Sequence, residues 1–160
     1  MKPKLGKGRE FRVLVAGMED AGKTTFMMQL EKKTAITWAS PATPMEGEMT
    51  IQKHRDHSLI VWDMNGSAEG RNKWEMHIEA VGALSAIIYV VDASAKYMLS
   101  TARLELERLM KYPNIGANVP FLLIANKMDA EMPLDCNQVR VVSTVGLLQS
   151  SSGSIKLRIH

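Results

Sequence analysis

Short apolar runs alternate with amphipathic segments along most of the chain. Runs rich in β-branched residues predict strands at 11–16, 49–54, 58–63, 84–91, 119–125 and 155–159. Apolar positions at helical spacing predict helices at 22–33, 70–80, 95–111 and 134–148, with loops at 34–47 and 150–154. Strands that alternate with helices need crossover connections, so the pattern predicts an α/β fold, a mostly parallel six-stranded sheet with helices on both faces.

The composition changes this picture only slightly. A length of 160 residues suits a single domain spanning 1–160, and the net charge of +3 is too weak to indicate nucleic acid as a partner. Much of the positive charge lies in a basic tail at 1–10, which is either a solvated segment or a contact for an acidic membrane surface. One cysteine, Cys136, excludes an internal disulfide, and we expect a reducing, cytoplasmic setting.

The strand predicted at 11–16 leads directly into a phosphate-binding motif. Gly17 to Thr24 fits G-x-x-x-x-G-K-[ST], and a helix is expected to follow. Lys23 is expected to reach the β- and γ-phosphates, and the Thr24 hydroxyl to ligate magnesium. Backbone amides of the loop and the helix N-terminus supply the rest of the cradle. The candidate phosphate-binding residues here are Gly17, Glu19, Asp20, Ala21, Gly22, Lys23, Thr24 and Thr25.

A second candidate lies where the strand at 58–63 ends. Asp63 stands at that end, and a carboxylate there can hold magnesium through water. Gly66 follows three residues later and can offer its amide to a γ-phosphate. Many strands end in aspartate as a turn residue, so the assignment depends on the neighbouring phosphate loop.

The third motif follows the strand at 119–125. In Asn126-Lys127-Met128-Asp129, the Asp129 carboxylate can accept two hydrogen bonds, which the N1–H and 2-amino groups of guanine both supply. Adenine lacks this donor pair and would leave the carboxylate unsatisfied. The Lys127 stem can lie across the base, and Asn126 can tie this loop to the phosphate loop. The motif therefore predicts a preference for guanine nucleotides.

In this order the three motifs resemble the Ras-like superfamily, and further segments are similar to its Arf-like branch. These segments are Trp62 to Gly66 with Arg71 to Glu75, Val90 to Ser94, and Ala125 to Ala130. The Asp-Met-x-Gly and Arg-Asn-x-Trp-Glu patterns are most similar to the subfamily of Arf-like protein six. The resemblance implies a small G-protein fold that binds GTP or GDP with Mg²⁺ and recruits an effector or coat in its GTP state. For this subfamily the coat is the BBSome at ciliary membranes, and an exchange factor and a GTPase-activating protein are further implied partners.

One departure concerns hydrolysis. The family places its catalytic glutamine after the switch II glycine, and this chain has Ser67 there. Serine is too short to orient the attacking water as glutamine does, so we expect a weak GTPase with slow intrinsic hydrolysis. The alternative is a GTP-binding scaffold or interaction module that does not hydrolyse at all. Glu69 is a less favoured substitute for the missing group.

A second departure concerns switch I. The family has a threonine there that contacts magnesium and the γ-phosphate. Thr43, in Pro41-Ala42-Thr43-Pro44, is the preferred candidate, and Thr50 and Thr37 are the alternatives.

The two ends of the chain also depart from the resemblance. The family's guanine-contacting C-terminal loop and last helix have no counterpart after His160, so we expect one sheet face to lack its helix. The family's amphipathic N-terminal helix is likewise missing, and no glycine follows Met1 to carry a myristoyl group. Peripheral membrane contact is therefore expected only for a longer form of the protein.

Several residues fit weaker alternatives. The four histidines share no metal-ligand spacing, so we expect no zinc site. His77 occupies a position where Arf-like proteins carry an effector-facing aromatic residue. With Trp62, Trp74, Met64 and Met76 it predicts an effector patch, and core packing is the alternative for Trp74. A P-loop nucleotide kinase is a third functional alternative, but it leaves Asn126 to Asp129 unexplained.

Overall fold

A single sheet organises the part of the chain that the computed structural model describes, which is residues 9–34, 48–54, 57–115, 118–130, 133 and 155–159. Its strands are β1 (Glu10–Gly17), β2 (Glu48–His54), β3 (His57–Asp63), β4 (Ala86–Asp92), β5 (Phe121–Asn126) and β6 (Ile155–Ile159). They lie in the order β2-β3-β1-β4-β5-β6, and every neighbouring pair is parallel except β2 with β3. The prediction of a mostly parallel six-stranded sheet is confirmed.

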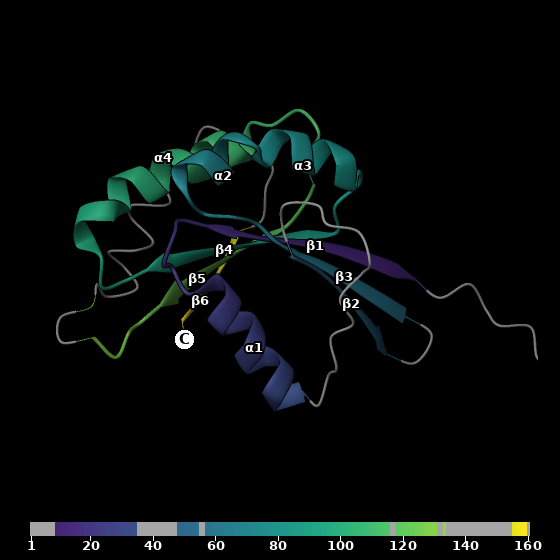
Figure 1. The fold of residues 1–160 in the computed structure, drawn as a ribbon, viewed down its shortest axis with the longest axis horizontal. Helices are drawn as coiled ribbons and strands as arrows, with labels where there is room; N and C mark the ends of the chain where they lie inside the picture. The colour runs from purple at the N-terminus through teal and green to yellow at the C-terminus, as the bar shows by residue number, and fades with distance from the viewer. Residues whose placement is uncertain are drawn as a thin grey trace, which may run out of the picture.

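Helices cover both faces of this sheet, as predicted. The helix α1 (Lys23–Thr34) lies on one face, and α2 (Ala68–Asn72), α3 (Trp74–Val81) and α4 (Leu99–Met110) lie together on the other (Figure 1). None of the helices within the described ranges is long and apolar enough to cross a lipid bilayer. The loop predicted at 34–47 begins one residue too early, because Thr34 still belongs to α1. The rest of that loop, the helix predicted at 134–148 and the loop predicted at 150–154 lie outside the described residues.

The single helix predicted at 70–80 is wrong, because two helices occupy this region. The α2 helix ends before Lys73, whose backbone N–H donates to the Gly70 carbonyl oxygen at 3.0 Å, one residue short of α-helical spacing. The α3 helix then begins at Trp74. Similarly, the helix predicted at 95–111 begins with a 3-10 turn, η1 (Lys96–Met98), before α4. Amphipathic spacing does not reveal such breaks, because they depend on individual backbone hydrogen bonds.

Alternation along β1 divides the core between the two faces. Leu14 and Ala16 are fully buried in the cluster that faces α3 and α4, whereas Val15, between them, is buried in the cluster that includes Met27 of α1. This follows from the two-residue period of a strand, whose side chains point alternately to opposite faces. A strand buried on both faces accounts for the continuous apolar run in the sequence.

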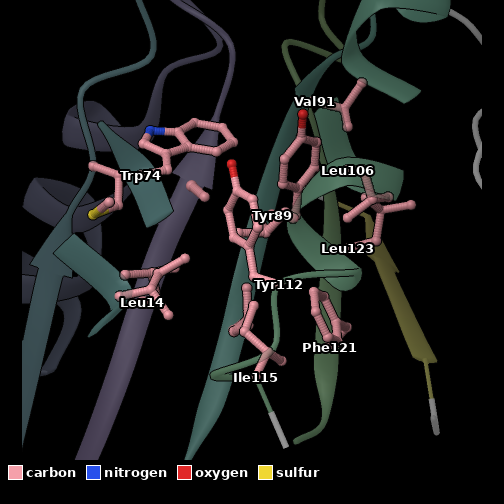
Figure 2. Close-up of a cluster of buried hydrophobic side chains, with 14 of the residues drawn as sticks. Leu14, Trp74, Tyr89, Val91, Leu106, Tyr112, Ile115, Phe121 and Leu123 are labelled. Carbon is pink, nitrogen blue, oxygen red and sulfur yellow. The ribbon is translucent and has the colours of Figure 1, made fainter. Parts of the chain in front are cut away.

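The cluster under α3 and α4 is rich in aromatic side chains, including Trp74, Tyr89, Tyr112 and Phe121 (Figure 2). Trp74 and Tyr89 are each 1% exposed. The Tyr89 hydroxyl donates to the Ala102 carbonyl oxygen of α4 at 2.8 Å, so its polar end is satisfied inside the core. Rings of this size anchor α3 and α4 on the sheet and so fix the segment that joins β3 to α3.

The parallel strands bring their last residues to one edge of the sheet. In the register, Val15 lies opposite Asp63, and Asp92 lies opposite Asn126. Gly17, the last residue of β1, lies opposite Val90. The three predicted motifs therefore begin side by side at the carboxyl edge, where ligands of open α/β sheets bind.

Candidate functional site

The loop between β1 and α1 requires glycine at both ends. Gly17 and Gly22 have φ angles of +149° and +86°, and a Cβ atom would collide with the Val90 carbonyl oxygen at the first and with the Asn126 side-chain amide at the second. The α1 helix then starts with a hydrogen bond from the Phe26 N–H to the Gly22 carbonyl oxygen at 2.8 Å. Amides in the first turn of a helix lack helical partners, so this loop presents an anion-binding site.

Lys23 places a positive charge inside this loop. Its side chain is 8% exposed, and its ammonium group donates to the Met18 carbonyl oxygen at 2.9 Å. Burial lowers the pKa of Lys23, and the carboxylates of Asp63, Asp20 and Glu19 oppose that shift. A buried ammonium group gains from an anionic ligand, because the ligand compensates for the water that the ammonium has lost.

Thr24 and Asp63 form the candidate metal position. The Thr24 hydroxyl donates to Asp63 Oδ2 at 2.6 Å, which joins the start of α1 to the end of β3. This hydroxyl keeps lone pairs after donating its proton, so Thr24 and Asp63 offer the hard oxygen ligands that magnesium takes. Among the described residues, no three His, Cys, Asp or Glu residues cluster as metal ligands. The residues present thus fit Mg²⁺.

The described residues place none of the three switch I candidates at this site. Thr43 and Thr37 lie outside the described residues. Thr50 lies in β2, where its backbone pairs with Val61 of β3. The position of the switch I threonine therefore remains a prediction from the sequence.

Asn126 connects the third motif to the phosphate loop. Its side-chain amide donates to the Ala21 carbonyl oxygen at 2.9 Å, and its own carbonyl oxygen accepts from the Ala93 N–H at 2.9 Å. The first contact is the one expected between the two loops. The second is made by the backbone carbonyl oxygen of Asn126 and joins this residue to the turn after β4, so Asn126 is held through both its side chain and its backbone.

Lys127 is held by a residue that the sequence reasoning did not select. Its ammonium group lies 2.7 Å from Asp92 Oδ2, and its backbone has a left-handed φ of +60°. Asp92 Oδ1 accepts from the Ser94 backbone N–H at 2.9 Å. Burial raises the pKa of Asp92, but hydrogen bonds from Lys127 and Ser94 outweigh it and lower the pKa overall. Asp129, two residues on, has an exposed side chain and is open to a ligand.

Gly66 packs directly on the phosphate loop. Its carbonyl oxygen accepts from the Glu19 N–H at 2.9 Å, and a Cβ atom at this position would lie 2.5 Å from the Gly17 carbonyl oxygen. The Met64 N–H donates to the Val15 carbonyl oxygen at 2.9 Å, which extends the pairing of β3 with β1. Glycine is therefore required at 66 by the close approach of two backbones.

Ser67 caps the N-terminus of α2. Its hydroxyl oxygen accepts from the Gly70 N–H at 3.1 Å, and its backbone is extended, with φ −62° and ψ 161°. Its own N–H donates to Asn65 Oδ1 at 2.9 Å. We did not predict this role, although a serine just before a helix whose first turn carries Glu69 is a recognised capping signal.

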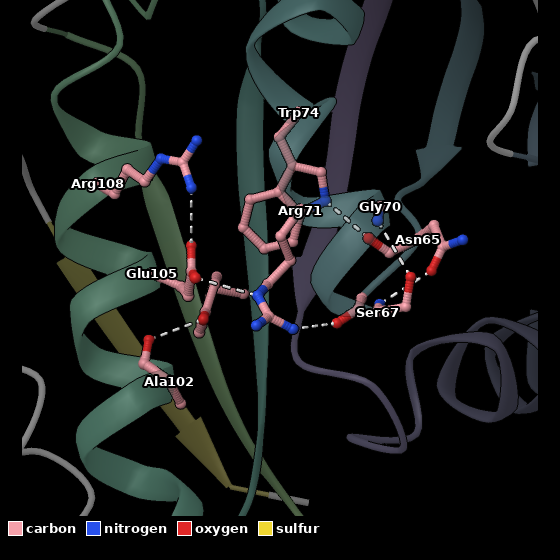
Figure 3. A network of polar contacts seen from close by, with 10 residues as sticks. Asn65, Ser67, Gly70, Arg71, Trp74, Ala102, Glu105 and Arg108 are labelled. Atoms are coloured by element: carbon pink, nitrogen blue, oxygen red, sulfur yellow. Dashed lines mark hydrogen bonds and ion pairs between the residues drawn. The ribbon is translucent and has the colours of Figure 1, made fainter.

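Arg71 joins α2 to α4 in an arrangement that the sequence reasoning also missed. One guanidinium nitrogen, Nη1, donates to the Gly66 carbonyl oxygen at 2.7 Å, and Nε lies 3.1 Å from Glu105 Oε1 (Figure 3). Nearby, the Trp74 indole N–H donates to the Asn65 carbonyl oxygen at 2.8 Å. No local pattern indicates the ion pair, because Arg71 and Glu105 lie on different helices and meet only in the folded chain.

The predicted effector patch is largely wrong as an exposed surface. Trp62, Trp74, Met64 and His77 are each at most 9% exposed, and all but His77 belong to the core cluster under α3 and α4. Of the five residues only Met76, at 58%, is exposed. Trp74 in particular follows the core-packing alternative, because its ring fills the space between α3 and the sheet.

The fold and the three loops at its carboxyl edge define a P-loop nucleotide-binding domain. The model of the ADP-ribosylation factor family matches residues 1–158. The chain therefore belongs to the ADP-ribosylation factor family, whose members are small GTPases that act as GTP-binding switches. This assignment leaves the nucleotide kinase alternative without support.

Individual relatives agree with the family. The chain is 37% identical over 136 residues to ADP-ribosylation factor-like protein 6 of Danio rerio, covering 83% of this chain and 70% of the relative. It is 32% identical over 134 residues to ADP-ribosylation factor-like protein 3 of Chlamydomonas reinhardtii, covering 83% and 71%. In fold it is similar to the Arl6 BBS3 small GTPase of Trypanosoma brucei, solved with the nucleotide analogue GppNp. The TM-score is 0.72 at 24% identity, over 94% of this chain and 87% of that one.

Proposed function

We propose that this chain is a GTP-dependent recruiter: it binds GTP or GDP with Mg²⁺, binds an effector or coat in its GTP state, and hydrolyses GTP slowly. The observation that carries the proposal is the hydrogen bond from the Asn126 amide to the Ala21 carbonyl oxygen. This bond joins the loop proposed to select a guanine base to the loop proposed to hold the phosphates.

At the phosphate end, each predicted residue has a proposed role. Amides of the segment Gly17 to Thr25 cradle the phosphates, and the Lys23 ammonium group neutralises the β- and γ-phosphates. Thr24 would bind the magnesium ion directly, Asp63 would hold it through water, and Thr43, the preferred switch I candidate, would complete the set with GTP. Bound magnesium supplies charge neutralisation between the β- and γ-phosphates. Gly66 offers its amide to the γ-phosphate.

At the base end, recognition is proposed to rest on Asp129. Its exposed carboxylate accepts both hydrogen bonds from guanine, and the Lys127 stem lies along the base. Asp92 fixes the end of Lys127 at 2.7 Å, so the lysine is ordered before the nucleotide arrives. Asn126 sets the distance between the base loop and the phosphate loop.

Slow hydrolysis is proposed from the position of Ser67. A residue that positions water must reach the γ-phosphate, but the Ser67 hydroxyl oxygen is engaged with the Gly70 N–H at the start of α2. The same contact supports the second candidate function, a GTP-binding module that does not hydrolyse. The two candidates differ in whether the chain hydrolyses GTP at all.

The partners are proposed from the similarity to Arf-like protein 6. Its subfamily suggests a coat of the BBSome type. It also suggests a cytoplasmic protein that binds peripherally to ciliary or other membranes. An exchange factor and a GTPase-activating protein belong to the same proposal. Met76 is the member of the predicted effector patch that is exposed for such a partner, at 58%.

Single-turnover hydrolysis of bound GTP tests this function. We expect guanine nucleotide to be extracted from the purified chain, and Ser67→Gln to hydrolyse GTP at least about tenfold faster than the parent. Ser67→Ala is the matched control, because it removes the same helix cap but supplies no group to position water. Equal rates in the parent and Ser67→Gln would contradict the catalytic explanation, and a chain without guanine nucleotide would contradict the function itself.

A further inference from the structure

The peptide group between Gly66 and Ser67 is restrained at both of its polar atoms. The Gly66 carbonyl oxygen accepts two hydrogen bonds, from the Glu19 N–H at 2.9 Å and from Arg71 Nη1 at 2.7 Å. The Ser67 N–H donates to Asn65 Oδ1 at 2.9 Å. A peptide group fixed in this way cannot rotate without breaking one of three hydrogen bonds.

One of these donors, Arg71, is itself held by a residue of the α4 helix. Its Nε atom lies 3.1 Å from Glu105 Oε1, and the two side chains are only 13% and 17% exposed (Figure 3). The other carboxylate oxygen of Glu105 lies 3.7 Å from Arg108 Nη1. Because water is largely excluded, this pair is screened less than a surface ion pair.

Glu105 is itself on a rigid support. Its neighbours on α4, Ala102, Leu106 and Leu109, are at most 5% exposed and pack into the core. The planar guanidinium group of Arg71 can serve a carboxylate and a carbonyl oxygen at once, whereas a lysine ammonium group is not shaped to bridge both. The ion pair therefore connects the buried face of α4 to the Gly66 carbonyl oxygen.

We infer that Arg71, held by Glu105, is a positioning residue that sets Gly66 for the γ-phosphate and so favours GTP over GDP. This rests on the proposed function, in which the γ-phosphate meets the Gly66 N–H, a group of the preceding peptide, whose Asn65 carbonyl oxygen accepts from the Trp74 indole N–H at 2.8 Å. If Gly66 is already held in place, less conformational entropy is lost when GTP binds. GDP has no γ-phosphate to meet Gly66, so its affinity does not depend on this arrangement.

Comparing GTP and GDP affinities separates positioning from general support of the fold. The probes are fluorescently labelled GDP and a labelled non-hydrolysable GTP analogue, titrated with magnesium present. We expect Glu105→Gln and Arg71→Lys each to lower the ratio of GTP-analogue affinity to GDP affinity about tenfold, a change of about 1.4 kcal/mol. The double variant should be no worse than the stronger single one, since both changes break the same connection.

A matched control lies on the same helix. Glu107 forms an ion pair with Arg103 of the same helix at 2.8 Å, so Glu107→Gln should leave the affinity ratio unchanged. An equal loss for both nucleotides, or an unchanged ratio in Glu105→Gln, would overturn the inference while leaving guanine nucleotide binding intact. Absence of binding to either nucleotide by the parent chain would instead contradict the proposed function, and the inference with it. Should the Arg71 variant not fold, Glu105→Gln, which keeps the size of the side chain, decides the matter.

Discussion

At the guanine end of the proposed site, Asn126 and Lys127 make their contacts with Ala21 and Asp92, which lie in or beside neighbouring strand ends. At the γ-phosphate end, Gly66 is held by Arg71, whose partner Glu105 lies on α4. The first set of contacts depends on the sheet, and the second depends on how two helices pack. We therefore propose that base selection and the response to the γ-phosphate depend on two separate sets of contacts, so that a mutation can disturb one without the other.

The largest expected effect comes from the support of the γ-phosphate end. Trp74 is 1% exposed and donates its indole N–H to the Asn65 carbonyl oxygen at 2.8 Å. Trp74→Ala should lower the free energy of unfolding by about 3–5 kcal/mol through the cavity that it leaves. Denaturant unfolding measures this loss. Trp74→Phe keeps most of the packing and should cost less than half as much; an equal cost in both variants would mean that the hydrogen bond, not the packing, dominates.

A somewhat smaller effect should weaken the binding of GDP and of GTP to the same extent. Lys23→Ala removes the buried ammonium group from the phosphate loop and should weaken GDP and GTP alike, by about 100-fold, the loss of charge-assisted hydrogen bonds. Titration with either nucleotide checks this. Lys111→Ala, an exposed lysine beyond the end of α4, is the control and should bind as the parent does. A loss confined to GTP would contradict the assignment of Lys23 to both phosphates.

The difference between the two ends of the site also explains which contacts could be predicted from the sequence. The strand ends and the contact of Asn126 with the phosphate loop were predictable, because each motif is contiguous and follows a strongly apolar strand. The cap formed by Ser67 and the bridge from Arg71 to Glu105 were not predicted. The Ser67 cap depends on the exact start of α2, in a region predicted as one helix. The bridge from Arg71 to Glu105 depends on how α2 packs beside α4. The burial of Trp62 in β3 and of His77 in α3 was missed for a similar reason, since periodicity does not say which face of a strand or helix another element will cover.

The smallest expected effect is confined to the base end. Asp92→Asn keeps the shape of the side chain but removes the charge that holds the Lys127 ammonium group at 2.7 Å. We expect GDP and GTP affinities to fall equally, by about fivefold, in the range of a partly exposed ion pair. Titration of both nucleotides checks this against Glu105→Gln, which should change their ratio instead. If Asp92→Asn altered the ratio, the two ends would not be independently supported.

The central claim is that this chain selects guanine nucleotides at a site already assembled at the carboxyl edge of the sheet. The most direct test is the affinity of the purified chain for GDP and for ADP, measured side by side with magnesium present. We predict that GDP binds at least about 100-fold more tightly than ADP, since ADP would leave the Asp129 carboxylate unsatisfied. Equal affinity for the two nucleotides would contradict it.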